Sequence, residues 1–134
     1  MSLSEIRTGL SQRLGTISGL RSADYVPDQV SPPVAIPIPT GITFDSTFGR
    51  AMDEYAFTIL VLVGMVSDRG AQKLMDRYSA SSGDMSIKTA IEADKTLGGA
   101  AFDCRVTEMR NYQQTPIGDQ MYLSAEFTVQ VYAQ

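Results

Sequence analysis

The chain begins with an amphipathic pattern at helical spacing. One face of it carries Leu3, Ile6, Leu10, Leu14 and Ile17. Because apolar residues three or four positions apart share one side of a helix, this pattern indicates a helix packed against a core. Ser2 and Glu5 just before it have the spacing of a capping box. The sequence therefore predicts a first helix over about residues 3–16.

Residues 21–50 follow neither the helical nor the strand period. The segment contains Pro27, Pro32, Pro33, Pro37 and Pro39. Prolines at these positions exclude a helix and a central strand, although residues 34–38 are compatible with a short edge strand. We therefore expect an extended, proline-rich loop. An irregular segment of this length is usually functional or mobile, and its Phe44 and Phe48 either serve that function or pack beneath the loop.

The middle of the chain has a recognisable boundary at nearly every element. Residues 55–65 are apolar on both faces, which predicts a strand that is central in its sheet or uses its second face at an interface. Ser67 and Asp68 then cap a helix that is expected to reach about Ser79. Asp84 or Ser86 caps a third helix, which the glycines at 98 and 99 end.

The last third alternates between apolar and polar residues, as half-buried strands do. Residues 102–107 form the first such strand, and residues 123–131 form the second and more regular one. Residues 112–120 are polar and are expected to be a long hairpin loop. The element order α-β-β-α-α-β-β predicts a single α+β domain over residues 1–134. We expect a two-layer sandwich with a mixed sheet of about four strands and helices on one face.

Strand directions follow from the connections. The link between the strands at 55–65 and 102–107 carries two helices, so these strands could run parallel to each other. The last two strands are joined by a loop without a helix, and an antiparallel hairpin is expected there.

Composition and charge argue against several classes of function. The formal net charge is −4, the isoelectric point is about 4.7, and the 11 Lys and Arg residues are scattered. Proteins that grip nucleic acid usually carry a basic patch. The chain has no histidine, which removes the commonest general base and the commonest transition-metal ligand. Cys104 is the single cysteine, so no internal disulfide forms, and its alternating neighbours predict a buried thiol.

The chain is expected to be cytoplasmic in origin. Its first residues are polar and acidic, unlike a signal peptide. The longest apolar run covers residues 56–66, and these 11 residues are fewer than the roughly 20 that cross a membrane.

Motifs that resemble reactive sites have simpler interpretations. Residues 83–89 superficially resemble a phosphate-binding loop, but Ile87 stands where the motif needs glycine, and the segment follows a helix. Ser67, Asp68 and Arg69 lack the histidine of a charge-relay triad. Lys88 and Glu92 are spaced as a weak surface ion pair on a helix. We predict no catalytic, cofactor-binding or metal-binding residues.

Three segments resemble a known family. They are residues 63–72 (Val-Gly-Met-Val-Ser-Asp-Arg-Gly-Ala-Gln), residues 82–91 (Ser-Gly-Asp-Met-Ser-Ile-Lys-Thr-Ala-Ile) and residues 97–99 (Leu-Gly-Gly). Together with Arg-Val-Thr at 105–107 and the final strand, they are similar to tail terminator and head–tail joining proteins of long-tailed bacteriophages, especially those of actinobacteria. The resemblance covers most of the chain from about Asp53 onward.

The resemblance implies a structural role in the virion. Proteins of this family form a ring, usually of six subunits, on the head-proximal end of the tail tube. The ring stops tube polymerisation, contacts the tail tube protein and the head connector, and lets DNA pass through its lumen without specific binding. The family has no catalytic residues and no cofactor. A head–tail connector or stopper is the alternative within this class.

Contacts with partners are expected at loops and exposed aromatic residues. Our candidates are Phe44, Phe48, Arg50 and Tyr112. Tyr25 and Tyr55 are further possible anchors, although aromatic residues also fill the core of a chain that lacks tryptophan. Two other classes of function stay open at this point, a small ligand-binding or enzymatic α+β domain and a nucleic-acid binder.

Overall fold

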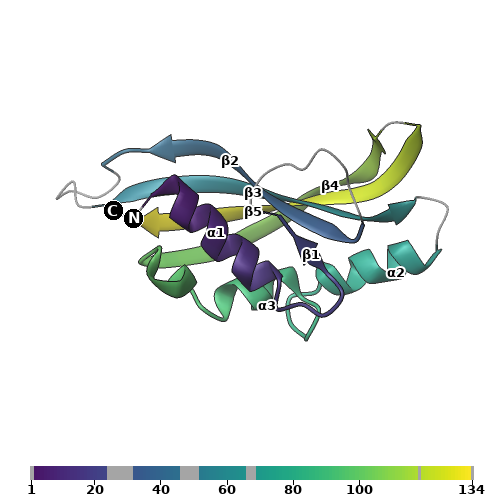
Figure 1. Ribbon diagram of the computed structural model, residues 1–134, viewed down its shortest axis with the longest axis horizontal. Helices are drawn as coiled ribbons and strands as arrows, with labels where there is room; N and C mark the ends of the chain where they lie inside the picture. Colours follow the sequence, from purple (N-terminus) through teal and green to yellow (C-terminus); the bar gives the residue numbers. More distant parts are fainter. Residues whose placement is uncertain (1, 24–31, 46–51, 66–68, 118, 134) are drawn as a thin grey trace.

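A long, twisted sheet carries helices on one of its faces (Figure 1). The computed structural model describes residues 2–23, 32–45, 52–65, 69–117 and 119–133. The helices are α1 (Leu3–Leu14), α2 (Arg69–Tyr78), α3 (Ile87–Glu92) and the short 3-10 helix η1 (Leu97–Gly99). The strands are β1 (Arg21–Ser22), β2 (Val34–Thr43), β3 (Asp53–Met65), β4 (Asp103–Ile117) and β5 (Gln120–Ala133). The expected α+β class is confirmed.

The sheet has five strands in the order β1-β2-β3-β5-β4, one more than the sequence predicts. β1 pairs parallel to β2 and the other pairs are antiparallel, so the sheet is mixed as expected. The additional strand is β1, which is only two residues long. Two residues cannot display a period, and β1 is defined by its backbone contacts instead. The Arg21 N–H donates to the Pro33 carbonyl at 3.0 Å.

The sheet order separates the two strands that were expected to run parallel. β5 lies between β3 and β4 and is antiparallel to both. β3 and β4 consequently run in the same direction, as the helical connection predicted, but they do not touch each other. The last strand of the chain is thus a central strand.

The polar segment at 112–120 belongs largely to the sheet, so the predicted long loop is wrong. β4 continues to Ile117 and β5 begins at Gln120. A register shift between Arg110 and Gln113 interrupts the alternation on β4, and Asn111 has a φ of 55° there. This bulge hides the strand from a search for period 2.

The core lies between the helices and the face of the sheet that they cover. The α1 positions with helical spacing are buried against β3 and β5 side chains such as Phe57 and Val129. Gly9 allows α1 to lie against η1, because a Cβ at this glycine would stand 2.8 Å from the Leu97 carbonyl oxygen. Tyr55 is buried in this core. On the other face of the sheet, Val34, Ile36 and Leu62 form a small second cluster.

The third helix is shorter than expected and ends at Glu92. Its start is confirmed, because the Ser86 hydroxyl accepts the Thr89 N–H at 3.1 Å and donates to the Ala80 carbonyl at 2.7 Å. The segment after it is held by Asp94, whose carboxylate accepts the N–H groups of Thr96 and Gly98. In the described part of the chain, no helix is long and apolar enough to cross a membrane.

Candidate functional site

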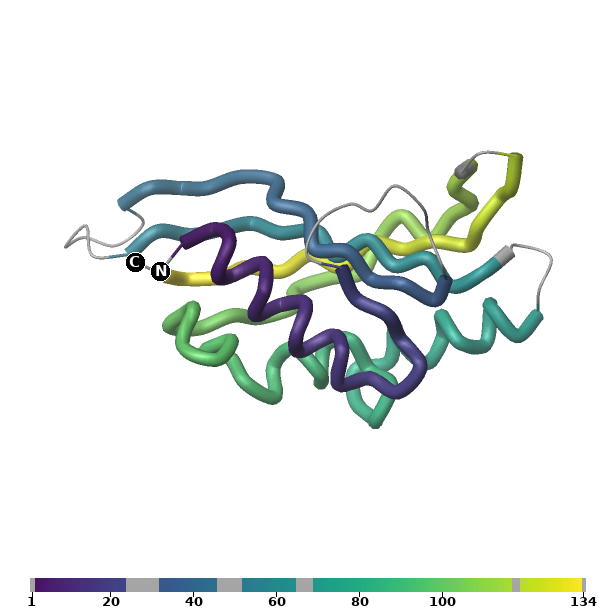
Figure 2. The backbone as a smooth tube through the Cα atoms, viewed as in Figure 1, coloured from purple at the N-terminus to yellow at the C-terminus, as the bar shows by residue number. Residues whose placement is uncertain are grey.

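The sheet is long, and its two ends lie far apart (Figures 1 and 2). Where β2 ends and β4 begins, Phe44 is 68% exposed and Phe102 is 46% exposed. On the β4–β5 hairpin, Tyr112 is 45% exposed and Met121, near the tip, is 40% exposed. The 13 residues of β3 run from the end with Phe44 toward the end with Met121, a length of about 40 Å at the usual rise of a strand.

The structure does not bring the predicted contact residues together. Phe44 and Tyr112 are exposed as expected, but they lie far apart, because Phe44 follows the end of β2 whereas Tyr112 lies on β4 at the level of residues 60–62 of β3. Phe48, Arg50 and Tyr25 lie outside the described residues. Tyr55 fills the core, so its interpretation as an anchor is wrong. The candidate site is therefore a pair of unlike surfaces.

Sequence reasoning missed Phe102 and Met121. Phe102 was expected inside a half-buried strand, but β4 begins one residue later, and the Phe102 backbone N–H donates to the Tyr132 carbonyl at 2.8 Å. Met121 continues the apolar alternation of β5 onto a part of the sheet that no helix covers. The alternation shows which face a residue occupies, but the length of the helices decides whether that face is covered.

The first surface, which we call the aromatic end, is acidic. It consists of Phe44, Asp45, Asp53, Phe102 and Asp103, all at the end of the sheet where β2 finishes and β4 starts. The Asp53 carboxylate accepts the backbone N–H of Asp45 at 3.0 Å, which ties the end of β2 to the start of β3. Phe44, Asp45, Phe102 and Asp103 are exposed.

The second surface, which we call the arm surface, is basic. It consists of Arg69, Lys73 and Arg77 on the exposed side of α2 together with Tyr112 and Met121 on the hairpin. Burial and the negative charge of Asp76 raise the pKa of the Tyr112 phenol above its usual value. α2 packs against β3 and β5, and β5 is the strand that carries Met121.

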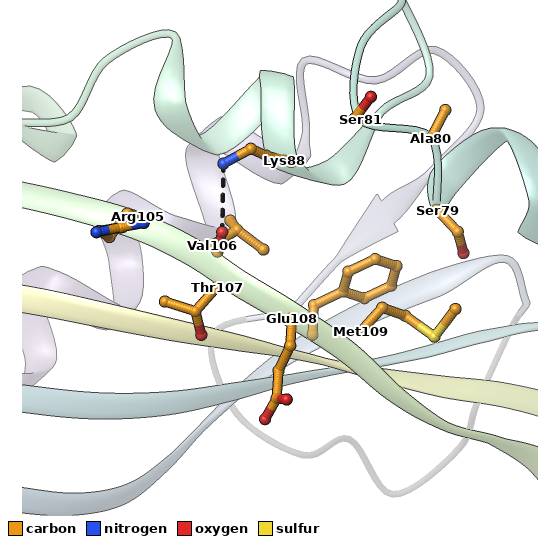
Figure 3. A pocket seen from close by; sticks show the side chains of 10 residues that line it. Ser79, Ala80, Ser81, Lys88, Arg105, Val106, Thr107, Glu108 and Met109 are labelled. Atoms are coloured by element: carbon orange, nitrogen blue, oxygen red, sulfur yellow. Dashed lines mark hydrogen bonds between the residues drawn. The ribbon is translucent and has the colours of Figure 1, made fainter.

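A cavity of about 240 Å³ lies beside the outer edge of β4 (Figure 3). Its wall is formed by Ser79–Ser81 after α2, Lys88 of α3, residues 105–109 of β4 and Phe127 of β5. The Lys88 ammonium donates to the Val106 carbonyl at 3.3 Å and to the Glu92 carboxylate at 2.6 Å. The Glu92 carboxylate also accepts the Val106 N–H at 2.9 Å. Lys88 and Glu92 thus bind the backbone of the sheet edge, which is more than the surface pair that their spacing predicted.

The charged groups of the cavity bind each other and the sheet. Burial alone would raise the pKa of Glu92, but hydrogen bonds from Lys88 and from the Val106 N–H hold it below its usual value, which favours the ionised carboxylate. Lys88 and Glu92 bind each other and the backbone of β4. Among the residues described, no group of three or more Cys, Asp or Glu side chains could hold a metal ion.

Cys104 is buried in β4 as expected. Burial, with the charges of Asp103 and Glu92, raises the pKa of the thiol to about 12. A thiol with such a pKa is protonated at neutral pH, and this state makes it a poor nucleophile.

No protein-family model matches the sequence, and no curated protein matches it at a significant level. The resemblance of short segments and the two surfaces described above are therefore the features that bear on the function of this chain.

Proposed function

We propose that this chain is a structural virion protein of the phage neck. In this proposal six copies form a ring on the head-proximal end of the tail tube, where the ring ends tube polymerisation and joins the tail to the head connector. The segments at 63–72, 82–91 and 97–99 support it by resemblance. A head–tail connector or stopper remains the alternative within the same class, and it differs in the neighbours that it binds.

The observation that carries the proposal is the presence of two unlike exposed surfaces at opposite ends of one sheet. A closed ring needs heterologous contacts, in which one patch of a subunit meets a different patch of the next. The aromatic end and the arm surface are such a pair, and they are separated by the length of β3. The acidic balance of the chain also suits a lumen through which DNA must pass without binding.

A small ligand-binding or enzymatic domain has less support. The cavity beside β4 holds about 240 Å³ and a second one between α1 and η1 holds about 350 Å³, so both lie below or near the lower end of the range of about 300–1,000 Å³ that is usual for small-molecule pockets. The best-placed charged groups of the first cavity, Lys88 and Glu92, already bind the Val106 backbone. A nucleic-acid binder also has less support, because the three cations of α2 form a small patch on a chain whose formal net charge is −4.

The proposal is tested with Phe44→Ala. Because Phe44 is 68% exposed, its loss should change the melting temperature by no more than about 2 °C. We expect the wild type to form rings alone or on purified tail tubes, and Phe44→Ala to lose them. Light scattering and negative-stain electron microscopy measure assembly, and Thr43→Ala, an exposed neighbour, is the control.

Two results would contradict this proposal. A wild-type chain that stays monomeric at high concentration, and that also fails to bind tail tubes, would exclude the ring. Equal losses of thermal stability and assembly in Phe44→Ala would place this side chain in the core of the fold.

A further inference from the structure

We propose that neighbouring copies of this chain meet head to tail, with the arm surface of one copy on the aromatic end of the next. The inference rests on the proposed ring, and it names the two surfaces that close the ring. The partner is a second copy of this chain, and the contact combines exposed apolar side chains with opposite charges.

Each surface offers apolar side chains of the kind that anchor interfaces. Phe44 and Phe102 stand at the two edges of the same sheet end, on β2 and just before β4. Three strand spacings separate these edges, which corresponds to about 14 Å. Tyr112 lies at the bulge of β4, and Met121 lies near the tip of the β4–β5 hairpin. Aromatic residues and methionine are enriched in interface cores, and sulfur–aromatic contacts are favourable.

The charges of the two surfaces are complementary. The aromatic end carries Asp45, Asp53 and Asp103, with Glu54 beside them on β3. The exposed side of α2 carries Arg69, Lys73 and Arg77 against one acidic residue, Asp76. Opposite potentials on facing surfaces speed association and select the register of the contact.

These charges are available to a partner. Within the described ranges the ion pairs are Lys88–Glu92 and Arg110–Glu108, and neither involves the aromatic end or α2. The three cations of α2 consequently have no carboxylate of their own chain within salt-bridge distance in the described part. A neighbouring copy supplies such carboxylates without breaking an existing pair.

The same charges disfavour a two-fold dimer in which either surface meets its own copy. In such an isologous contact the acidic end would face an acidic end, or the basic α2 would face a basic α2. Like charges placed opposite each other cost free energy. A contact between unlike surfaces avoids this cost, and because every copy has one of each, it can repeat around a ring.

Charge reversal tests the inference. The arm variant carries Lys73→Glu and Arg77→Glu, and the end variant carries Asp45→Lys and Asp103→Lys. Each variant alone presents like charges at every contact, so we expect its midpoint concentration for assembly to rise by on the order of tenfold or more. Combining all four substitutions in one chain should restore assembly to within about threefold, because the charges are again opposite.

Mixing the two variants is the sharper experiment. The acidic arm of one variant matches the basic end of the other, and the converse contact is also favourable. An equimolar mixture should therefore form rings in which the two variants alternate, and native mass spectrometry should show equal numbers of each. Arg105→Glu with Arg110→Glu is the control for the arm variant, because it makes the same change in net charge at exposed positions outside both surfaces.

The outcomes separate this inference from the proposed ring. If the wild type forms rings but both variants assemble with an unchanged midpoint, the inference is overturned and the ring stands. If each variant loses assembly and neither the mixture nor the combined chain recovers it, the head-to-tail pairing is also overturned. A wild type that forms no ring on tail tubes would overturn the proposed function, and the inference with it. Thermal unfolding of every variant shows whether it is folded.

Discussion

Cys104 shows how a single side chain can report on the core. The alternation around it predicted burial, and the structure confirms this. The thiol is favoured in its protonated form, because burial and the nearby charge of Asp103 raise its pKa from 9.0 to about 12. A group whose pKa is raised on folding stabilises the fold below its unfolded pKa, and this stabilisation is lost as pH rises toward the folded pKa.

Cys104→Ala should therefore change how stability depends on pH. Above about pH 9 the wild type should lose up to about 1.4 kcal/mol of unfolding free energy per pH unit relative to the variant. Both proteins keep Tyr78, whose pKa burial also raises, so its contribution cancels in the comparison. Urea unfolding of the two proteins between pH 7 and 11 measures the difference. Parallel stability curves would show that the thiol titrates normally.

The exposed residues of the candidate site were only partly predictable. Phe44 follows a proline-rich strand in a sequence with no strong period, so its exposure could be foreseen. Phe102 could not, because it alternates in phase with Cys104 and Val106 and differs from them only in preceding the first paired residue of β4. The alternation of apolar and polar residues shows which face of a strand a side chain occupies. The residue at which the strand begins to pair depends on the tertiary fold.

At the scale of elements, both edges of the sheet are protected against pairing with other chains. On β2, the carbonyls of Pro33 and Ala35 accept N–H groups of Arg21 and Ala23 from the β1 side, so alternate residues point outward. Pro37 and Pro39 occupy the next outward positions and offer no N–H. On β4, the side chains of α3 bind Val106 in place of a neighbouring strand. Unprotected edges promote aggregation.

Glu92→Ala should open the β4 edge. The variant leaves the Val106 N–H without its acceptor, so we expect a loss of about 1–3 kcal/mol in unfolding free energy and more aggregation on heating. The pKa of Glu92 is lowered from 4.5, so the stabilisation is present above that pH and is lost as pH falls through the lowered value. Urea unfolding at pH 7 and at pH 3 measures this, with Glu108→Ala at an exposed position as the control. An equal gap between wild type and variant at both pH values would argue against the ionised contact.

Helices and strands whose apolar residues recur regularly were predictable from the sequence. Those in which this pattern is short or interrupted were not. The stripe of α1, the doubly apolar β3 and the alternation of β5 each followed from sequence. The pairing of β1 and the extension of β4 beyond Arg110 did not, since one has two residues and the other contains a bulge. The position of β5 between β3 and β4 depends on contacts between residues far apart in the sequence, so no local pattern of residues predicts it.

At the scale of the whole molecule, the central strands β3 and β5 hold the two surfaces apart. β3 and β5 pair over most of their lengths, and the core side chains of both are buried. This arrangement fixes the aromatic end and the arm surface relative to each other, so a contact at one sets the direction of the next. Regular repetition of one contact is what a closed ring needs.

Hydrogen exchange of the assembled protein should show protection at both the aromatic end and the arm surface. We expect the amides around residues 43–45 and around residues 112–121 to exchange more slowly in the ring than in dilute monomer, because each end meets a neighbouring copy. Amides of β3 at 57–61 should exchange slowly in both states, since they lie in the centre of the sheet. The arm variant, which carries Lys73→Glu and Arg77→Glu, should match the monomer at all of these positions. Protection at one end alone would instead mean that the copies meet through identical surfaces.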